Sequence, residues 1–183
     1  MKLIQRELYD QVESRTAAAR DRITAMVRPL DPSKLAEHPE PGAWSVGQVL
    51  EHLCITFDLM EKSGRAAASR ARADAGAPLR EWHSSWFGGF IAKSLIRPKP
   101  VSAPAAFRPG PTPRGGVLEA MRSLDQALLQ LMQDTKQLDW VAVRVKSPAL
   151  PRWAPSYNLG DAFYIHTVHI ERHAGQIERL LSS

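Results

Sequence analysis

Three histidines occupy what should be the apolar stripe of the last helix of this chain, and no other feature constrains the fold as strongly. Residues 156–181, SYNLGDAFYIHTVHIERHAGQIERLL, have the periodicity of one amphipathic helix with an acidic residue in its first turn. Steps of three and four residues place His166, His169 and His173 on the face that would pack against a core. Burying imidazoles there costs free energy unless each one is hydrogen-bonded or coordinated. The chain must therefore bring polar partners or an ion to this face.

His169 and His173 are one helical turn apart, the spacing at which two imidazoles can reach a single divalent ion. The same spacing is common among surface histidines and hydrogen-bonded core histidines, so the pair alone does not establish a metal site. His166 lies seven residues from His173, roughly 10 Å along the helix, and is not expected to share the ion. Two ligands are too few for a tight site, so a third must come from another element.

The chain has 183 residues, of which 44% are apolar, and this predicts one globular domain spanning 1–183. The first residues, MKLIQRELYD, carry charges and no apolar run, and no later run approaches the length of a membrane span. We therefore expect a cytoplasmic protein without a membrane partner. Cys54 is the single cysteine, which excludes an internal disulfide and a cysteine-rich zinc module, and we interpret it as a small buried apolar residue.

Four amphipathic segments predict long helices, at about 4–27, 45–73, 112–132 and 156–181. The second has the clearest start, because Ser45 and Gln48 form a capping box. The only stretch with extended character is VAVRV at 141–145. The expected fold class is therefore all-α, a four-helix bundle, with a long crossover and covering segment between the second and third helices.

That covering segment, residues 75–115, is rich in Gly, Pro and Ser, with aromatic residues clustered in EWHSSWFGGF at 81–90. The prolines of IRPKPVSAPAAFRPGPTP, at 96–113, exclude regular helix there. We expect the segment to wall the site, with Trp82, His83 or Trp86 near the mouth. Between residues 62 and 114, Lys and Arg outnumber Asp and Glu by ten to two, so the basic charge is concentrated in this region.

The second helix carries His52, which is expected to face inward at the edge of the core. Three stretches, GAWSVGQVLEHL at 42–53, AAFRPGP at 105–111 and HIERHAGQI at 169–177, together resemble the DinB/YfiT-like superfamily of metalloenzymes. The resemblance implies a four-helix bundle in which one histidine of the second helix and two of the fourth hold a divalent metal. Carried over position by position, the ligands are His52, His169 and His173.

Other polar residues near these histidines are candidates for hydrogen bonds to the ligands. They are His166 and Gln176 on the fourth helix and Gln48 and Thr56 on the second. Glu51 and Glu171 adjoin ligands in the sequence but should point elsewhere, about 100° and 200° around their helices. The catalytic acid and base therefore stay unassigned.

Three neutral imidazoles leave a coordination position open, which is typical of a catalytic metal site. Zinc, nickel and iron all suit this ligand set. We expect a metal-dependent enzyme that activates a water or a thiolate, for hydrolysis or thiol transfer on a small molecule. The resemblance adds a low-molecular-weight thiol as a second cofactor. The sequence leaves open a non-enzymatic, metal-stabilised stress or interaction protein, a nucleic-acid partner for the basic segment 62–114, and a homodimer.

Overall fold

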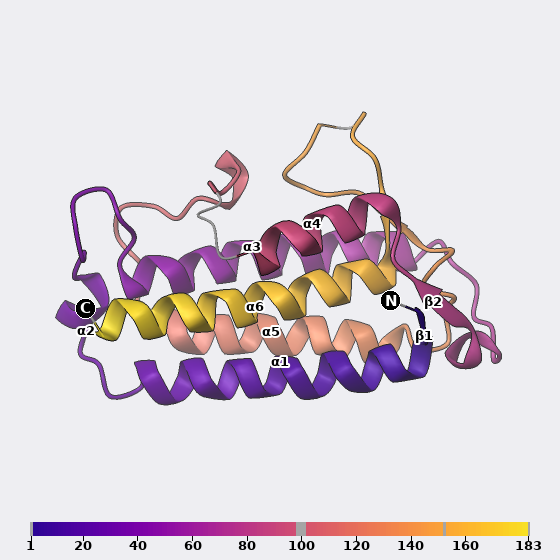
Figure 1. Cartoon of the computed structure of the whole chain (residues 1–183), viewed down its shortest axis with the longest axis horizontal. Coiled ribbons are helices and arrows are strands. Elements are labelled where there is room, and N and C mark those ends of the chain that lie inside the picture. Colours follow the sequence, from indigo (N-terminus) through magenta and orange to yellow (C-terminus); the bar gives the residue numbers. More distant parts are fainter. Residues whose placement is uncertain (1, 98–101, 152, 183) are drawn as a thin grey trace.

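Four long helices pack along one another in the computed structural model, which describes residues 2–97, 102–151 and 153–182 (Figure 1). The bundle helices are α1 (Gln5–Val27), α3 (Val46–Ala68), α5 (Val117–Asp134) and α6 (Leu159–Ser182). Shorter pieces connect them: α2 (Pro32–Ala36), η1 (Ala77–Leu79), α4 (Trp86–Ile96) and η2 (Ala105–Phe107). Strand β1 (Lys2–Ile4) pairs antiparallel with β2 (Glu81–His83), and β3 (Arg144–Val145) with β4 (Tyr157–Asn158). The predicted all-α fold is confirmed.

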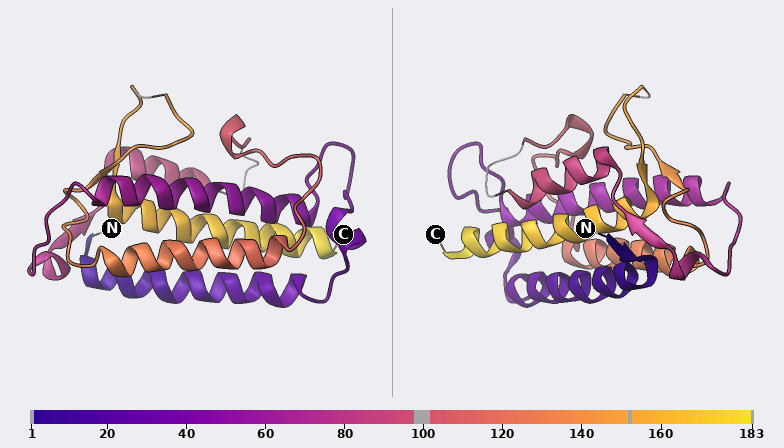
Figure 2. Two further views of the ribbon diagram at one scale, coloured as in Figure 1. Left: turned by 180° about the vertical axis from the view of Figure 1, so that it is seen from behind. Right: turned by 45° about the vertical axis from the view of Figure 1, so that its right-hand side comes forward.

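The direction of the helices shows a crossover topology. In Figures 1 and 2, α1 and α6 run in one direction along the bundle, and α3 and α5 run in the other. The most extensive packing is between α1 and α6 and between α3 and α5. Because α3 and α5 are parallel neighbours, the chain must return along the whole bundle between them, as the length of the covering segment indicated.

The capping box predicted for α3 is present. The Ser45 hydroxyl accepts from the Gln48 amide at 3.2 Å, and the Gln48 side-chain oxygen accepts from the Ser45 amide at 3.1 Å. Three predicted boundaries were wrong: α3 ends at Ala68 instead of near residue 73, α5 begins at Val117 instead of 112, and α6 begins at Leu159 instead of 156. Residue Gly116 precedes α5 with φ +66°, a backbone conformation that glycine adopts without strain.

Helix α4 was not predicted, because EWHSSWFGGF has two adjacent glycines and no clear helical periodicity. Its start is capped by Ser85, whose hydroxyl accepts from the Gly88 amide at 3.1 Å. A side chain at Gly88 would overlap Asp161 of α6. The glycine therefore lets α4 approach α6 closely, and tertiary packing outweighs its low helix propensity. Part of the proline-rich run predicted to be irregular, residues 98–101, lies outside the described residues.

The bundle core is continuous. Its largest fully buried side chains include Trp82, Trp140, Phe57 and Phe163. Across residues 2–97, 102–151 and 153–182, the helices all fall short of the length and apolar character needed to cross a bilayer.

Candidate metal centre

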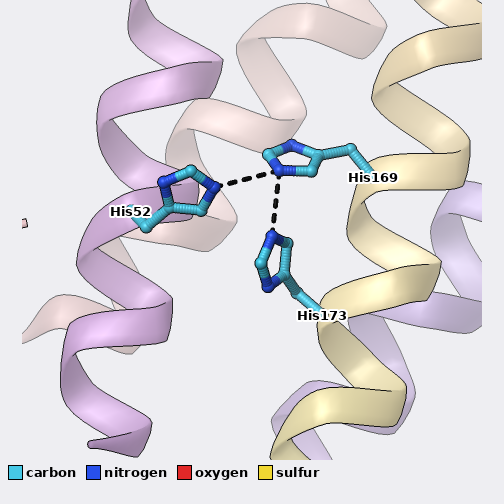
Figure 3. Close-up of side chains that lie close together, drawn as sticks. All are labelled: His52, His169 and His173. Atoms are coloured by element: carbon cyan, nitrogen blue, oxygen red, sulfur yellow. Dashed lines mark hydrogen bonds between the residues drawn. The ribbon is translucent and has the colours of Figure 1, made fainter. Parts of the chain in front are cut away.

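One histidine of α3 and two of α6 point at one another across the interface between these helices (Figure 3). The Nε2 atom of His169 lies 3.0 Å from Nε2 of His52 and 2.9 Å from Nε2 of His173. Candidate ligand atoms of the three rings all lie within 4.8 Å of one another. Tetrahedral bonds of about 2.0–2.1 Å correspond to nitrogen separations of roughly 3.3 Å, so small adjustments would suit an ion. The predicted convergence of the three rings is confirmed.

Hydrogen bonds at the far side of two rings determine which nitrogen carries the proton. His52 Nδ1 lies 2.6 Å from the carbonyl oxygen of Phe107, and His173 Nδ1 lies 2.8 Å from the side-chain oxygen of Gln176. Oxygen accepts in both pairs, so each Nδ1 donates its proton, and each Nε2 of the neutral ring holds a lone pair. Both lone pairs face Nε2 of His169, which can offer at most one proton. Three nitrogens therefore converge with one proton at most, and a cation satisfies all three.

The electrostatic setting keeps these rings neutral. Burial lowers the pKa of His52. Burial, followed by the neighbouring His173 and His52, lowers the pKa of His169 well below its usual range. Burial and the nearby His52 lower the pKa of His173 to about 3. Neutral imidazole is the form that binds a metal ion, so none of these rings has to lose a positive charge before an ion binds near neutral pH.

The end of η2 and the residues after it cover the α3 side of the site. His52 Nδ1 donates to the Phe107 carbonyl, and the side-chain amide of Gln48 donates to the carbonyl of Gly110 at 3.0 Å. The indole of Trp44 lies against His52, with ring centroids 5.1 Å apart. The proline-rich part of the covering segment therefore walls the site, as expected.

The aromatic part of the covering segment does not lie where the sequence predicted. Trp82 is fully buried and its indole N–H donates to Asn158 at 3.1 Å, just before α6. His83 belongs to β2, paired with β1. Eleven residues separate Asn158 from His169, roughly 16 Å along the helix axis. Trp86 is exposed at the start of α4, beside the first turn of α6. Trp82 and Trp86 therefore lie beside the N-terminal end of α6, away from the histidines near its middle, and the buried Trp82 indole finds its hydrogen-bond acceptor there.

Among the predicted hydrogen-bonding neighbours, Gln176 contacts a candidate ligand ring, as expected. Gln48 instead caps α3 and holds Gly110, and the Thr56 hydroxyl donates to backbone carbonyls, one of them that of His52. Both therefore support the backbone around the site.

The fourth candidate, His166, has a different partner. Its Nε2 lies 2.8 Å from Asp125, and the other Asp125 oxygen lies 3.1 Å from Arg20. His166 and Asp125 are both fully buried, so this contact joins α5 and α6 inside the core. On α5 the buried Asp125 lies next to Leu124, which packs partly buried against the core. An acidic residue between Met121 and Leu128 was the missed signal.

The other reactive side chains near the site, two glutamates and one cysteine, are either ion-paired or buried. Arg114 donates to Glu51, which lowers the pKa of that carboxyl, and Arg15 pairs with Glu171 at 2.7 Å. Neither glutamate points as a base toward the histidines, as expected. Cys54 is buried, and burial raises the pKa of its thiol to about 11. The interpretation of Cys54 as a small buried residue is confirmed.

A family model described as the DinB superfamily matches residues 15–177. The matched range includes α3, η2 and the three histidines. No curated protein and no solved structure shows a significant match.

Proposed function

The chain belongs to the DinB superfamily, and from this membership and its three converging histidines we propose that it is a metal-dependent enzyme acting on a small molecule. His52, His169 and His173 would hold one divalent ion, with zinc, nickel and iron as candidates for a nitrogen-only ligand set. When bound by three imidazoles, such an ion keeps an open position and lowers the pKa of a water or thiol there. The observation that carries the proposal is the meeting of three Nε2 atoms with at most one proton.

The rest of the site prepares the rings for an ion. The Phe107 carbonyl and the Gln176 amide fix the orientation and tautomer of two ligands. Trp44 and residues 107–110 cover His52 and limit the access of bulk water. The folded protein therefore already orders two of the three imidazole rings before an ion binds.

Between the two reactions, the surroundings support thiol transfer better than hydrolysis. The two carboxylates next to ligands in the sequence, Glu51 and Glu171, are both in ion pairs and are not placed to act as general bases. A free thiol has a pKa of about 8.5, whereas that of water is about 15.7. A thiol therefore needs much less help to ionise, and a low-molecular-weight thiol fits a site without a dedicated base.

A cobalt-loaded sample tests this choice. We expect a low-molecular-weight thiol to add an intense near-ultraviolet absorption band, because a thiolate bound to cobalt gives a charge-transfer transition that water does not. His169→Ala, treated identically, should show no such band. A wild-type spectrum that does not change at saturating thiol would rule out thiol transfer and leave hydrolysis as the proposed reaction.

The burial of the site favours one alternative, a structural ion in a non-enzymatic stress or interaction protein. The three rings are only 4–7% exposed. If the ion is structural, removing it with a chelator should lower the melting temperature by more than 15 °C, given 2–4 °C per kcal/mol for a chain of about this size. Under the enzyme proposal the continuous apolar core maintains the fold, and we expect a shift of about 5 °C or less.

A further inference from the structure

Exposed aromatic side chains gather on one side of the bundle, away from the core. On α4, Trp86 is 79% exposed and Phe90 is 60% exposed, with ring centroids 6.3 Å apart. On the loop between β3 and β4, Trp153 is 85% exposed. Figures 1 and 2 show α4 lying outside the bundle against α6, with this loop projecting beyond it on the same side. Large apolar groups exposed together on adjoining elements mark an interaction surface.

Helix α4 has two different faces. Gly88 and Ala92 are buried, and the helix packs against α6. On the opposite face, Trp86 and Phe90 are followed at helical spacing by exposed Lys93 and Arg97. The outer stripe therefore has an aromatic half and a cationic half.

The two stretches of sequence that form this surface carry charges of one sign. Residues 82–116 and 140–160 contain no Asp or Glu, although the chain has 19 of them. The same two stretches contain five and three Lys and Arg residues respectively. In space, the Asp161 carboxylate contacts Ser85 at the start of α4 but is buried, and Arg114 is paired with Glu51. Exposed apolar rings together with exposed Lys93 and Arg97 complement a partner surface that is both apolar and anionic.

We propose that α4 and the β3–β4 loop dock this protein on the surface of an anionic lipid bilayer. The rings of Trp86, Phe90 and Trp153 enter the headgroup region, where aromatic side chains with apolar bodies are favoured. Lys93 and Arg97 lie on the same outer stripe of α4 and contact lipid phosphates. The sequence predicted no membrane partner because no apolar run is long enough to span a bilayer. Helix α4 would instead lie flat on the bilayer surface.

The exposed aliphatic residues on these elements favour lipid over nucleic acid. Ile96 of α4 is 59% exposed and Leu150 of the loop is 37% exposed. Single-stranded nucleic acid is bound by stacking bases on aromatic rings, to which aliphatic side chains add little. Acyl chains, by contrast, accept aliphatic and aromatic side chains alike.

Co-sedimentation of the full chain with lipid vesicles tests the proposal. We expect binding to phosphatidylcholine vesicles that contain about one third phosphatidylglycerol, weaker binding at high salt, and little binding to pure phosphatidylcholine. Trp86→Ser combined with Phe90→Ser should lower the partition coefficient by about tenfold or more. Lys93→Gln should lower it by about fivefold.

Two substitutions on other elements serve as matched controls. Leu79, in η1, is 70% exposed, and Lys34, in α2, is also exposed. Leu79→Ser and Lys34→Gln should leave the partition coefficient unchanged. Circular dichroism establishes that every variant is folded.

Three results would overturn the proposal. One is a wild-type protein that does not bind anionic vesicles, or α4 variants whose partition coefficient equals that of the wild type. Another is tight binding of single-stranded DNA without vesicle binding, which would assign the surface to nucleic acid. The third is a dimer in solution that dissociates in the Trp86 and Phe90 variant while vesicles stay unbound, which would assign it to a second copy of the chain.

Discussion

Replacing Gln176 with leucine removes the acceptor that orients His173 and keeps its Nε2 unprotonated. The acceptor lies 2.8 Å from His173 Nδ1. A hydrogen bond between neutral groups contributes about 0.5–1.5 kcal/mol, and one to a charged group about 1.5–3 kcal/mol. Once an ion binds Nε2, the donated proton becomes more acidic and the bond approaches the charged case. Metal affinity should therefore fall by about 10- to 100-fold. Because Gln176 is half-buried, water replaces part of the lost bond, and we expect the lower end of this range.

Competition with a chromophoric zinc chelator at fixed pH measures this affinity directly. Gln176→Glu keeps an acceptor at the same place and should bind zinc at least as tightly as the wild type. Gln130→Leu is the matched control, because Gln130 is exposed on α5 and bonds Asp134 away from the site. An affinity for Gln176→Leu within about twofold of the wild type, a difference of only about 0.4 kcal/mol, would refute the role of this bond in holding His173.

Two further substitutions test the core that supports the site. Asp125→Ala strips the acceptor from a buried histidine and a half-buried arginine, and should destabilise the fold by about 3 kcal/mol, or about 6–12 °C in melting temperature. Asp21→Ala, at an exposed position, should change the stability by less than about 0.5 kcal/mol in urea unfolding. Gly160→Ala would place a methyl group against the Trp82 indole and should lower the free energy of unfolding by about 1–3 kcal/mol. At Gly115 an added methyl group would meet nothing within 4 Å, so Gly115→Ala should not destabilise the fold. Equal unfolding midpoints for these two variants would contradict the packing described.

The four bundle helices and the histidine pair of α6 could be predicted because both depend on local periodicity. Helical spacing determines which residues share a face, so the positions of His169 and His173 on one turn follow from the sequence alone. The capping box at Ser45 similarly fixed the start of α3. His52 as the third partner came from the resemblance to a family, since its side of the bundle depends on how the helices are arranged.

What could not be predicted depends on contacts between elements distant in the sequence. Helix α4 contains two glycines and forms where Gly88 fits against Asp161. Trp82 packs away from the metal site, and its indole N–H donates to the buried side chain of Asn158 just before α6. The contact between His166 and Asp125 joins residues 41 positions apart on neighbouring helices. The contacts of Gly88 and Trp82 leave no periodic signal in the sequence, whereas Asp125 stands at helical spacing between Met121 and Leu128 but does not name its partner.

The metal content of His169→Ala, compared with the wild type after identical loading with zinc and desalting, tests the central claim most directly. His169 Nε2 lies between the other two candidate ligands, so its loss separates them. His38→Ala is the control, because this histidine is exposed in the connection between α2 and α3. We predict about one ion per chain in the wild type and in His38→Ala, and almost none in His169→Ala, with unchanged helical content by circular dichroism. A His169→Ala protein that retains as much zinc as the wild type would contradict the three-histidine metal site.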